Sequence, residues 1–169
     1  SLRWYRQMVG IASVGDTTVV SNKWMLGTRN SFIVGISATF LATALGTVAA
    51  LGLSRPHMPF KGTIMAILIS PMIVPLIITS AGMFFFYSKI GLTHTYLGLI
   101  LAHTALGTPF VVITVTATLT GFDTNLIRAS QSLGADTMRT FFKVIMPLIL
   151  PGVISGALFA FITSFDEVV

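Results

Sequence analysis

The chain has 169 residues, of which 54% are apolar and only 9% are charged, and its mean hydropathy is +0.90. A soluble domain of this length needs a larger polar surface, so the composition excludes the ordinary soluble classes and indicates a membrane protein. The net charge of +5 comes from Lys and Arg scattered over an apolar chain, which is typical of the flanks of membrane spans rather than of a nucleic-acid-binding patch. No cysteine is present, so disulfides and thiolate metal sites are excluded.

The first 29 residues precede any apolar stretch that is long enough to cross a bilayer. They contain Arg3, Arg6, Asp16 and Lys23 and no cleavable apolar core, so they do not form a signal peptide. We expect residues 1–29 to form an extracytoplasmic loop or amphipathic segment. Because the chain does not begin with Met, we also expect it to be an internal piece of a longer protein.

Four stretches between charged residues are long enough to span a bilayer, which takes about 20 apolar residues in a helix. They predict spans at about 31–54, 63–87, 96–120 and 146–166, within one transmembrane domain over residues 30–169. The predicted fold is therefore an all-α, polytopic transmembrane helical bundle of about four to five spans.

Small residues and prolines predict how these spans pack and bend. Small side chains recur at helical spacing along the first span, at Gly35, Ala38, Ala42, Gly46 and Ala49. Helices in lipid associate through close backbone approach, so this stripe predicts a helix-packing face. Pro71 and Pro75 in the second span and Pro109 in the third can bend those helices.

The longest charged connection, residues 121–145, has apolar side chains that roughly follow a period of 3.6 residues. The pattern predicts a short pair of amphipathic helices, which Asp123 or Thr124 can cap. Gly134 in its middle either breaks the helix or removes a side chain where another backbone must come close. Such a pair either docks a partner protein or lies on lipid head groups, and the pattern leaves both open.

The distribution of Lys and Arg does not by itself orient the chain. Five basic residues fall on each side of a four-span arrangement, namely Arg55, Lys61, Arg128, Arg139 and Lys143 against Arg3, Arg6, Lys23, Arg29 and Lys89. Arg3 and Arg6 lie far from any span and count for less, which favours a cytoplasmic position for residues 121–145.

This connection resembles the EAA loop of the inner-membrane permeases of type I ABC importers. The family pattern is Glu-Ala-Ala, three residues, Gly, nine residues, an aliphatic residue, one more residue and Leu-Pro. This chain has Arg128-Ala129-Ser130, Gly134, Val144 and Met146-Pro147 at those places. The resemblance covers essentially the whole chain. It implies that residues 121–145 form a cytoplasmic coupling loop that sits in a cleft of an ATPase subunit.

The resemblance also implies which residues would contact the ATPase subunit. These are Arg128, Ala129, Ser130, Leu133, Gly134, Met138, Phe142 and Pro147. Arg128 stands where the family has Glu, so the usual salt bridge to the ATPase is in question. Either the partner carries a compensating change or the loop relies on packing by Leu133, Met138 and Phe142, unless Arg128 simply faces water.

As a member of that family, the chain would be a multi-pass protein of the bacterial inner membrane and would contain the second to fifth helices of the fold. Its partners would be a second permease subunit, a dimer of ABC ATPase subunits, an extracytoplasmic solute-binding protein and the lipid bilayer, with no nucleic acid. ATP and magnesium would be bound by the ATPase subunits. The chain has no ATP-binding or catalytic motif, so we expect it to need no cofactor and not to be an enzyme.

Three short segments resemble the polyamine importers for spermidine and putrescine, namely Ser1-Leu-Arg-Trp-Tyr5, Leu101-Ala-His-Thr104 and Ser164-Phe-Asp-Glu-Val168. Opine, aminoethylphosphonate and 4-aminobutyrate permeases share much of this sequence and remain alternatives. An ion channel or a secondary transporter is the alternative from another class.

A cationic solute needs acceptors along its path, and Asp166 and Glu167 are the only adjacent carboxylates in the chain. The ring of Phe165, like Phe86 and Tyr87, could offer a cation–π face. The alternative is that these residues lie at the membrane interface, where charges and aromatic rings are common. His103 either lines the path or donates to a Thr or Ser of another helix, and its spacing from His94 does not suit a metal site.

Overall fold

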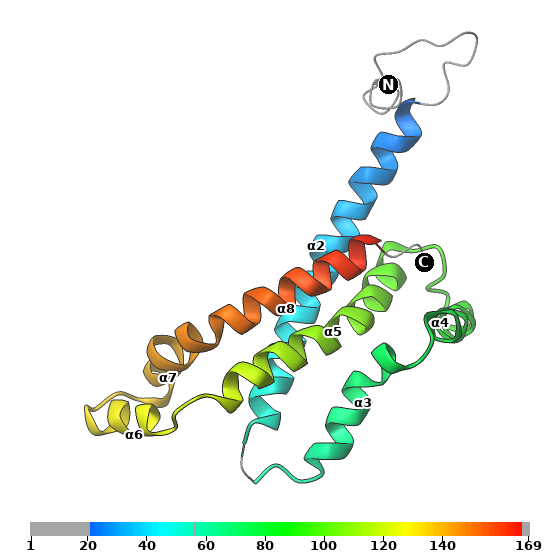
Figure 1. Ribbon diagram of the computed structural model, residues 1–169. Coiled ribbons are helices and arrows are strands. Elements are labelled where there is room, and N and C mark those ends of the chain that lie inside the picture. Colours follow the sequence, from blue (N-terminus) through cyan, green and yellow to red (C-terminus); the bar gives the residue numbers. More distant parts are fainter. Residues whose placement is uncertain (1–20, 56, 167–169) are drawn as a thin grey trace, which may run out of the picture.

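The structure is a computed structural model that describes residues 21–55 and 57–166 (Figure 1). In chain order it has α2 (Ser21–Leu53), α3 (Lys61–Ile73), α4 (Leu76–Ile90), α5 (Tyr96–Thr120), α6 (Asn125–Ser132), α7 (Thr137–Thr140), the π-helix η1 (Phe141–Ile145) and α8 (Met146–Asp166). Every regular element in these ranges is a helix, which confirms the all-α prediction. Three stretches are long and apolar enough to cross a membrane, namely Met25–Leu53, Tyr96–Thr120 and Thr137–Asp166, and α3 with α4 forms a bent pair that can count as a fourth.

The long helices α2, α5 and α8 lie side by side and form the core of the bundle (Figure 1). Their contact region is made of small and β-branched side chains, and its buried members are Ala42, Ala50, Val111, Val115, Ile149 and Ala160. The stripe predicted on the first span is this packing face, because Gly35, Ala38, Ala42 and Gly46 are buried and Ala49 is half-buried. The sequence therefore predicted the face of α2 correctly.

Glycines set the spacing between α5 and its two neighbours. A β-carbon on Gly46 of α2 would stand 2.7 Å from the β-carbon of Val111 of α5. On α8, a β-carbon on Gly152 would collide with the hydroxyl of Thr118, and one on Gly156 would stand 2.8 Å from the α-carbon of Val111. These helices therefore approach as closely as the absence of a side chain allows.

The helix α2 begins earlier than the sequence predicted. Residues 21–29 were expected to belong to a loop or amphipathic segment, and they instead continue the span as helix. No proline occurs between Ser21 and Leu53, and an isolated Gly27 costs a helix only about 1 kcal/mol, so nothing stops the helix at residue 30. The first turns of α2 extend past the rest of the bundle (Figure 1). Residues 1–20, the remainder of that segment, lie outside the described residues.

The stretch expected as a span over residues 63–87 consists of two helices, α3 and α4, bent by 100° at Val74 and Pro75. Pro75 has no N–H to donate to Pro71, and its ring forces Val74 into the extended conformation seen there, with φ −71° and ψ 134°. In contrast, α5 continues through Pro109 without a break. Of the three prolines that were expected to bend their helices, Pro75 lies at the bend, whereas Pro71 and Pro109 lie inside the continuous helices α3 and α5.

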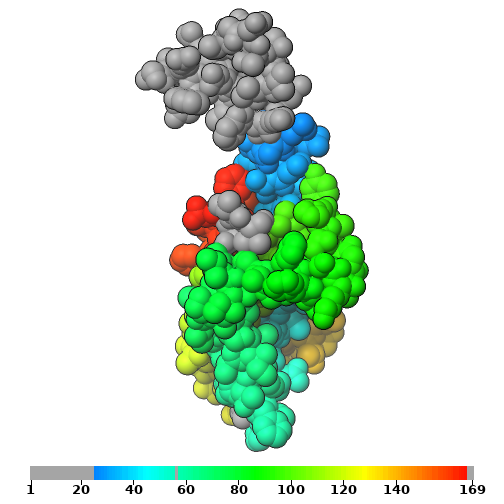
Figure 2. Space-filling model, turned by 90° about the vertical axis from the view of Figure 1, so that its right-hand side faces the viewer, coloured from blue at the N-terminus to red at the C-terminus, as the bar shows by residue number. Residues whose placement is uncertain are grey.

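Helices α3 and α4 make up much of one face of the molecule (Figure 2). Neither helix has a buried residue, and large apolar side chains such as Ile67, Ile77 and Phe85 are exposed on them. Exposed apolar surface of this kind suits a lipid or protein environment rather than water.

Candidate functional site

The connection between α5 and α8 is built as a rigid helical pair. Asp123 accepts a hydrogen bond from the backbone N–H of Asn125 (2.9 Å) at the start of α6. At the other end of α6, Gly134 has φ +81°, its N–H donates to the carbonyl of Gln131, and the N–H of Ala135 donates to the carbonyl of Ser130. These two hydrogen bonds form the Schellman ending of a helix, which requires a left-handed residue that glycine adopts without strain. Gly134 therefore ends α6, which is the helix-breaking role, the first of the two that the sequence predicted for it.

Two further contacts join α6 to the start of the next helix. Asp136 accepts a hydrogen bond from the N–H of Arg139 (2.7 Å) and so caps α7. The hydroxyls of Ser130 and Thr140 share a hydrogen bond of 2.8 Å, and Thr140 is buried. This bond joins α6 to the helix that continues through η1 into α8.

A π-helical turn, η1, separates α7 from α8. In it the N–H of Met146 donates to the carbonyl of Phe141, five residues earlier. Pro147 follows directly, and it has no N–H with which to continue the regular ladder. The wider turn accommodates the proline, and π-helical turns of this kind often occur at functional sites.

The residues predicted to contact an ATPase subunit lie at this end of the bundle and are mostly exposed. Leu133 is 88% exposed, although it is apolar. Arg128, Ala129, Gly134, Met138, Phe142 and Pro147 are exposed as well, whereas Ser130 is half-buried and bonded to Thr140. Arg128 forms no ion pair with any residue in the described ranges. Three of the exposed side chains are large and apolar, and we call Leu133, Met138 and Phe142 together the α6–α7 surface.

A cavity of about 400 Å³ lies between this connection and the ends of α2 and α5. Its walls include Leu51 and Arg55 of the α2 end, Leu119 of α5, Ile127 of α6 and Phe141 of η1. The helical pair therefore rests over a space rather than on a fully packed core.

At the opposite end of the bundle, His103 of α5 joins α8. Its Nδ1 lies 2.8 Å from the hydroxyl oxygen of Ser164, and both side chains are buried. This is the interhelical hydrogen bond to a Ser or Thr that the sequence predicted as one of two roles for His103. The other ring nitrogen, Nε2, is buried and has no hydrogen-bond partner among the described residues.

His103 also lines a cavity of about 200 Å³ between α2, α5 and α8, which we call the His103 cavity. Tyr96 lines it too, and its hydroxyl donates to Oδ1 of Asn30 over 2.9 Å. The remaining polar walls are Ser31 and Ser164, and Phe165 contributes an aromatic one. The cavity thus places polar groups from three helices together near one end of the bundle.

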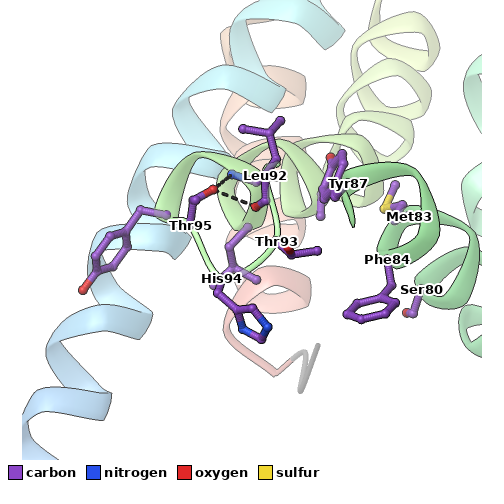
Figure 3. Close-up of a pocket in the computed structure, with 12 residues that line it drawn as sticks. Ser80, Met83, Phe84, Tyr87, Leu92, Thr93, His94 and Thr95 are labelled. Carbon is purple, nitrogen blue, oxygen red and sulfur yellow. Dashed lines mark hydrogen bonds between the residues drawn. The ribbon is translucent and has the colours of Figure 1, made fainter. Parts of the chain in front are cut away.

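A larger cavity of about 480 Å³ lies beside it, between α4 and the start of α5, and shares Tyr96 and Leu99 as walls. Figure 3 shows Tyr87, Phe84 and Met83 on α4, with His94 and Thr95 on the turn that leads into α5. Thr95 caps α5, because its hydroxyl donates to the carbonyl of Leu92 (2.7 Å) and accepts from the N–H of Gly98 (3.1 Å) (Figure 3). Tyr87 therefore lines a cavity, whereas Phe86 packs against Tyr87 and is not among its walls.

The predicted path residues at the end of α8 differ in position. Phe165 is partly exposed and its ring packs with those of Phe32 (5.2 Å between centroids) and Phe161 (5.6 Å). Asp166 is exposed at the last turn of α8, and Glu167 lies outside the described residues. Among residues 21–55 and 57–166, no three His, Asp or Glu side chains come together as metal ligands.

The sequence did not identify Asn30, Ser31 and Tyr96 as site residues. Tyr96 and Asn30 are 66 residues apart, and no periodicity relates the start of one span to that of another. The signal that was available is that polar residues begin both spans and that His103 lies two turns further along the same helix.

Comparison with known proteins places these features in a family context. A family model described as "binding-protein-dependent transport system inner membrane component" matches residues 23–169. The spermidine/putrescine transport system permease protein PotC of Haemophilus influenzae is 32% identical over 140 residues, which are 83% of this chain and 54% of that protein. The PotC protein of Escherichia coli is 33% identical over 133 residues, 79% of this chain and 50% of that protein.

A relative with a different described role is also similar. The osmoprotective compounds uptake permease protein GgtD of Synechocystis is 30% identical over 138 residues, which are 82% of this chain and 46% of that protein. The chain spans about half the length of the curated relatives that it matches.

Proposed function

Because the chain belongs to the binding-protein-dependent transport system inner membrane component family, as its EAA-type pattern predicted, we propose that it is a permease subunit of an ATP-driven importer. In this proposal, ATP and magnesium are bound by a separate dimer of ATPase subunits, a second permease subunit completes the path, and an extracytoplasmic binding protein delivers the solute. The assembly lies in the bacterial inner membrane. Family membership argues against the ion-channel and secondary-transporter alternatives.

The observation that carries the coupling role is the α6–α7 surface. Leu133, Met138 and Phe142 are exposed on a segment whose own backbone hydrogen bonds are satisfied by capping, so the surface is preorganised to bind a partner. Arg128 is exposed and has no ion-pair partner among the described residues, which supports docking through apolar contacts rather than through the salt bridge of the family pattern. The Ser130–Thr140 hydrogen bond then passes the movement of the docked segment to α8.

This role fixes the orientation that the charge count left open. With the α6–α7 surface on the cytoplasmic side, Arg55, Lys61, Arg128, Arg139 and Lys143 all lie there. This agrees with the preference that the charge count gives once Arg3 and Arg6, which lie far from any span, count for less. The His103 cavity, Phe165 and Asp166 then lie toward the extracytoplasmic side, where the solute enters.

The solute that we propose is a small polyamine such as spermidine or putrescine. The two PotC relatives are described as spermidine/putrescine permeases, whereas the relative GgtD is described as an uptake permease for osmoprotective compounds. Asp166 supplies an exposed carboxylate beside the aromatic cluster of Phe32, Phe161 and Phe165, which suits an ammonium group. Opines, aminoethylphosphonate and 4-aminobutyrate remain the competing solutes.

The test is ATP hydrolysis by the complete importer in lipid vesicles, with its binding protein, across a panel of these solutes. Stimulation by spermidine or putrescine alone supports the whole proposal. Stimulation by another member of the panel retains the importer role and rejects the polyamine assignment. Hydrolysis that no solute and no binding protein stimulates would contradict the importer role itself.

A further inference from the structure

The His103 cavity has one feature that the coupling role does not use. His103 is only 5% exposed, its Nδ1 contacts Ser164, and its Nε2 is buried without a partner in the part of the chain that the structure describes. An unpaired polar atom in a buried position is costly, so structures normally provide a partner for it. The imidazole lines the His103 cavity together with Asn30, Tyr96 and Ser164.

We propose that this cavity binds the primary ammonium end of the transported solute. The inference rests on the proposed function and extends it to a defined subsite. In the proposed site, Nδ1–H of the neutral imidazole donates to the hydroxyl of Ser164, which leaves the lone pair of Nε2 to accept one ammonium proton. Nε2 is closed to solvent in the structure, so binding requires a small movement of the ring that opens this nitrogen to the cavity. The choice of tautomer follows from the ligand, because an ammonium group offers three donors and no acceptor.

Two oxygens complete the set of acceptors. Oδ1 of Asn30 already accepts from the Tyr96 hydroxyl, and an amide oxygen has a second lone pair for another donor. The Tyr96 bond fixes the Asn30 side chain and so holds that lone pair in place. The hydroxyl of Ser31, one residue further along α2, supplies the third acceptor.

The charge is compensated by aromatic faces and by a nearby carboxylate. Tyr96 and Phe165 are both walls of the cavity, and their partly exposed rings offer faces that attract an ammonium group. Asp166 follows Phe165, a wall of the cavity, directly in α8, and its exposed carboxylate is the described negative charge nearest to the site along the chain. A cavity of about 200 Å³ holds an amine end and its first methylene groups, while the rest of the solute extends outside it.

The experiment uses the complete importer in vesicles and compares uptake of putrescine with uptake of N,N,N′,N′-tetramethylputrescine, which keeps one N–H at each end. The measured quantity is the ratio of kcat/KM for the two solutes. This ratio does not depend on how much folded transporter each preparation contains. The selectivity of the binding protein also cancels when variants of the permease are compared.

For His103→Leu we expect the preference for putrescine to fall about tenfold, which is the effect of one hydrogen bond to a charged group. His103→Gln keeps an acceptor and should recover part of it. Tyr96→Phe, at an exposed position, removes only the hydroxyl that fixes Asn30, should lower the ratio about threefold, and tests the proposal even if His103→Leu fails to assemble. His57→Leu, an exposed histidine in the connection after α2, is the matched control and should leave the ratio unchanged.

The outcomes separate the subsite from the function on which it rests. A lower ratio in His103→Leu or Tyr96→Phe, together with an unchanged ratio in His57→Leu, supports the ammonium site. A wild-type ratio in both cavity variants overturns the site and leaves the importer role in place. Absence of any amine uptake by the wild-type importer overturns the polyamine assignment and the site together.

Discussion

Gly46 of α2 lies so close to Val111 of α5 that a β-carbon on Gly46 would stand 2.7 Å from the β-carbon of that valine. Both residues are buried, and the atom in the way is at the base of the valine side chain, which cannot turn aside. The separation of the two helices is therefore fixed by the backbone of α2 at this point.

Gly46→Ala should destabilise the bundle by about 1–3 kcal/mol, because the added methyl group forces the helices apart. The measurement is the fraction of purified protein that stays monodisperse after heating. Gly52→Ala on the same helix is the matched control, since nothing lies within 4 Å of its added β-carbon. This control should be neutral or slightly stabilising, because Ala is the better helix former. Equal stability of the two variants would contradict the close approach.

Substitution of Gly134 should separate backbone strain from loss of docking. With φ +81° and open space around it, Gly134 should tolerate Asn, which visits the left-handed region readily, far better than Val. We expect Gly134→Val to disorder the end of α6 and to reduce co-purification with the ATPase subunit, and Gly134→Asn to retain most of it. Protease sensitivity of the segment reports the strain independently. Strong loss of binding in Gly134→Asn with an intact segment would indicate that the partner touches this position directly.

The hydrogen bond between Ser130 and Thr140 should appear as a coupling energy in a double-mutant cycle. Ser130→Ala leaves the buried hydroxyl of Thr140 without this partner and should cost about 1–3 kcal/mol, whereas Ser130→Ala with Thr140→Val removes both polar groups. The double variant should therefore cost less than the sum of the single ones in thermal stability. Ser132→Ala, an exposed serine on the same helix, serves as the control. Strict additivity would show that the two hydroxyls do not interact.

Local patterns predicted the parts of the fold that depend on neighbouring residues. The small-residue stripe predicted the buried face of α2, and the apolar period of about 3.6 residues over residues 121–145 predicted the helical pair. Pro75 broke its helix and Pro109 did not, although both lack the same N–H. α5 is packed on α2 and α8 around its proline, which is buried, whereas α3 and α4 have no buried residue. Pro71 also lies inside a continuous helix, α3, without such packing, so packing accounts for the straight course of α5 alone.

The His103 cavity could be predicted only in part. A polar side chain in an apolar span needs a hydrogen-bond partner, and the sequence of α5 alone shows that His103 is such a side chain. Its interhelical hydrogen bond could therefore be predicted. The contact between Tyr96 and Asn30 depends on how far α2 and α5 slide along each other. That offset is set by the close approach of Gly46 to Val111, which only the folded structure contains.

Pro75→Ala should reduce the bend between α3 and α4. The new N–H can donate to the carbonyl of Pro71, and Val74 is released from the extended conformation. Spin labels on cysteines introduced at Ile67 and Phe85, both exposed, should move toward the roughly 27 Å expected for 18 residues of continuous helix. Pro71→Ala, inside α3, should leave the distance as it is. An unchanged distance in Pro75→Ala would show that the bend is imposed by packing rather than by the proline.

The π-helical turn η1 gives the chain one residue more than a regular α-helix needs between Thr140 and Met146. Removal of one residue from this turn should therefore leave the rotational register on both sides unchanged. Ile149, Gly152, Gly156, Ala160 and Ser164 would still face α5, and the cap at Asp136 would still start α7. A single deletion elsewhere in α8 would instead rotate everything beyond it by about 100° and turn that stripe away from its partners. The η1 turn is thus the place along this span where the chain can lose a residue and still keep the same side-chain contacts between α8 and α5.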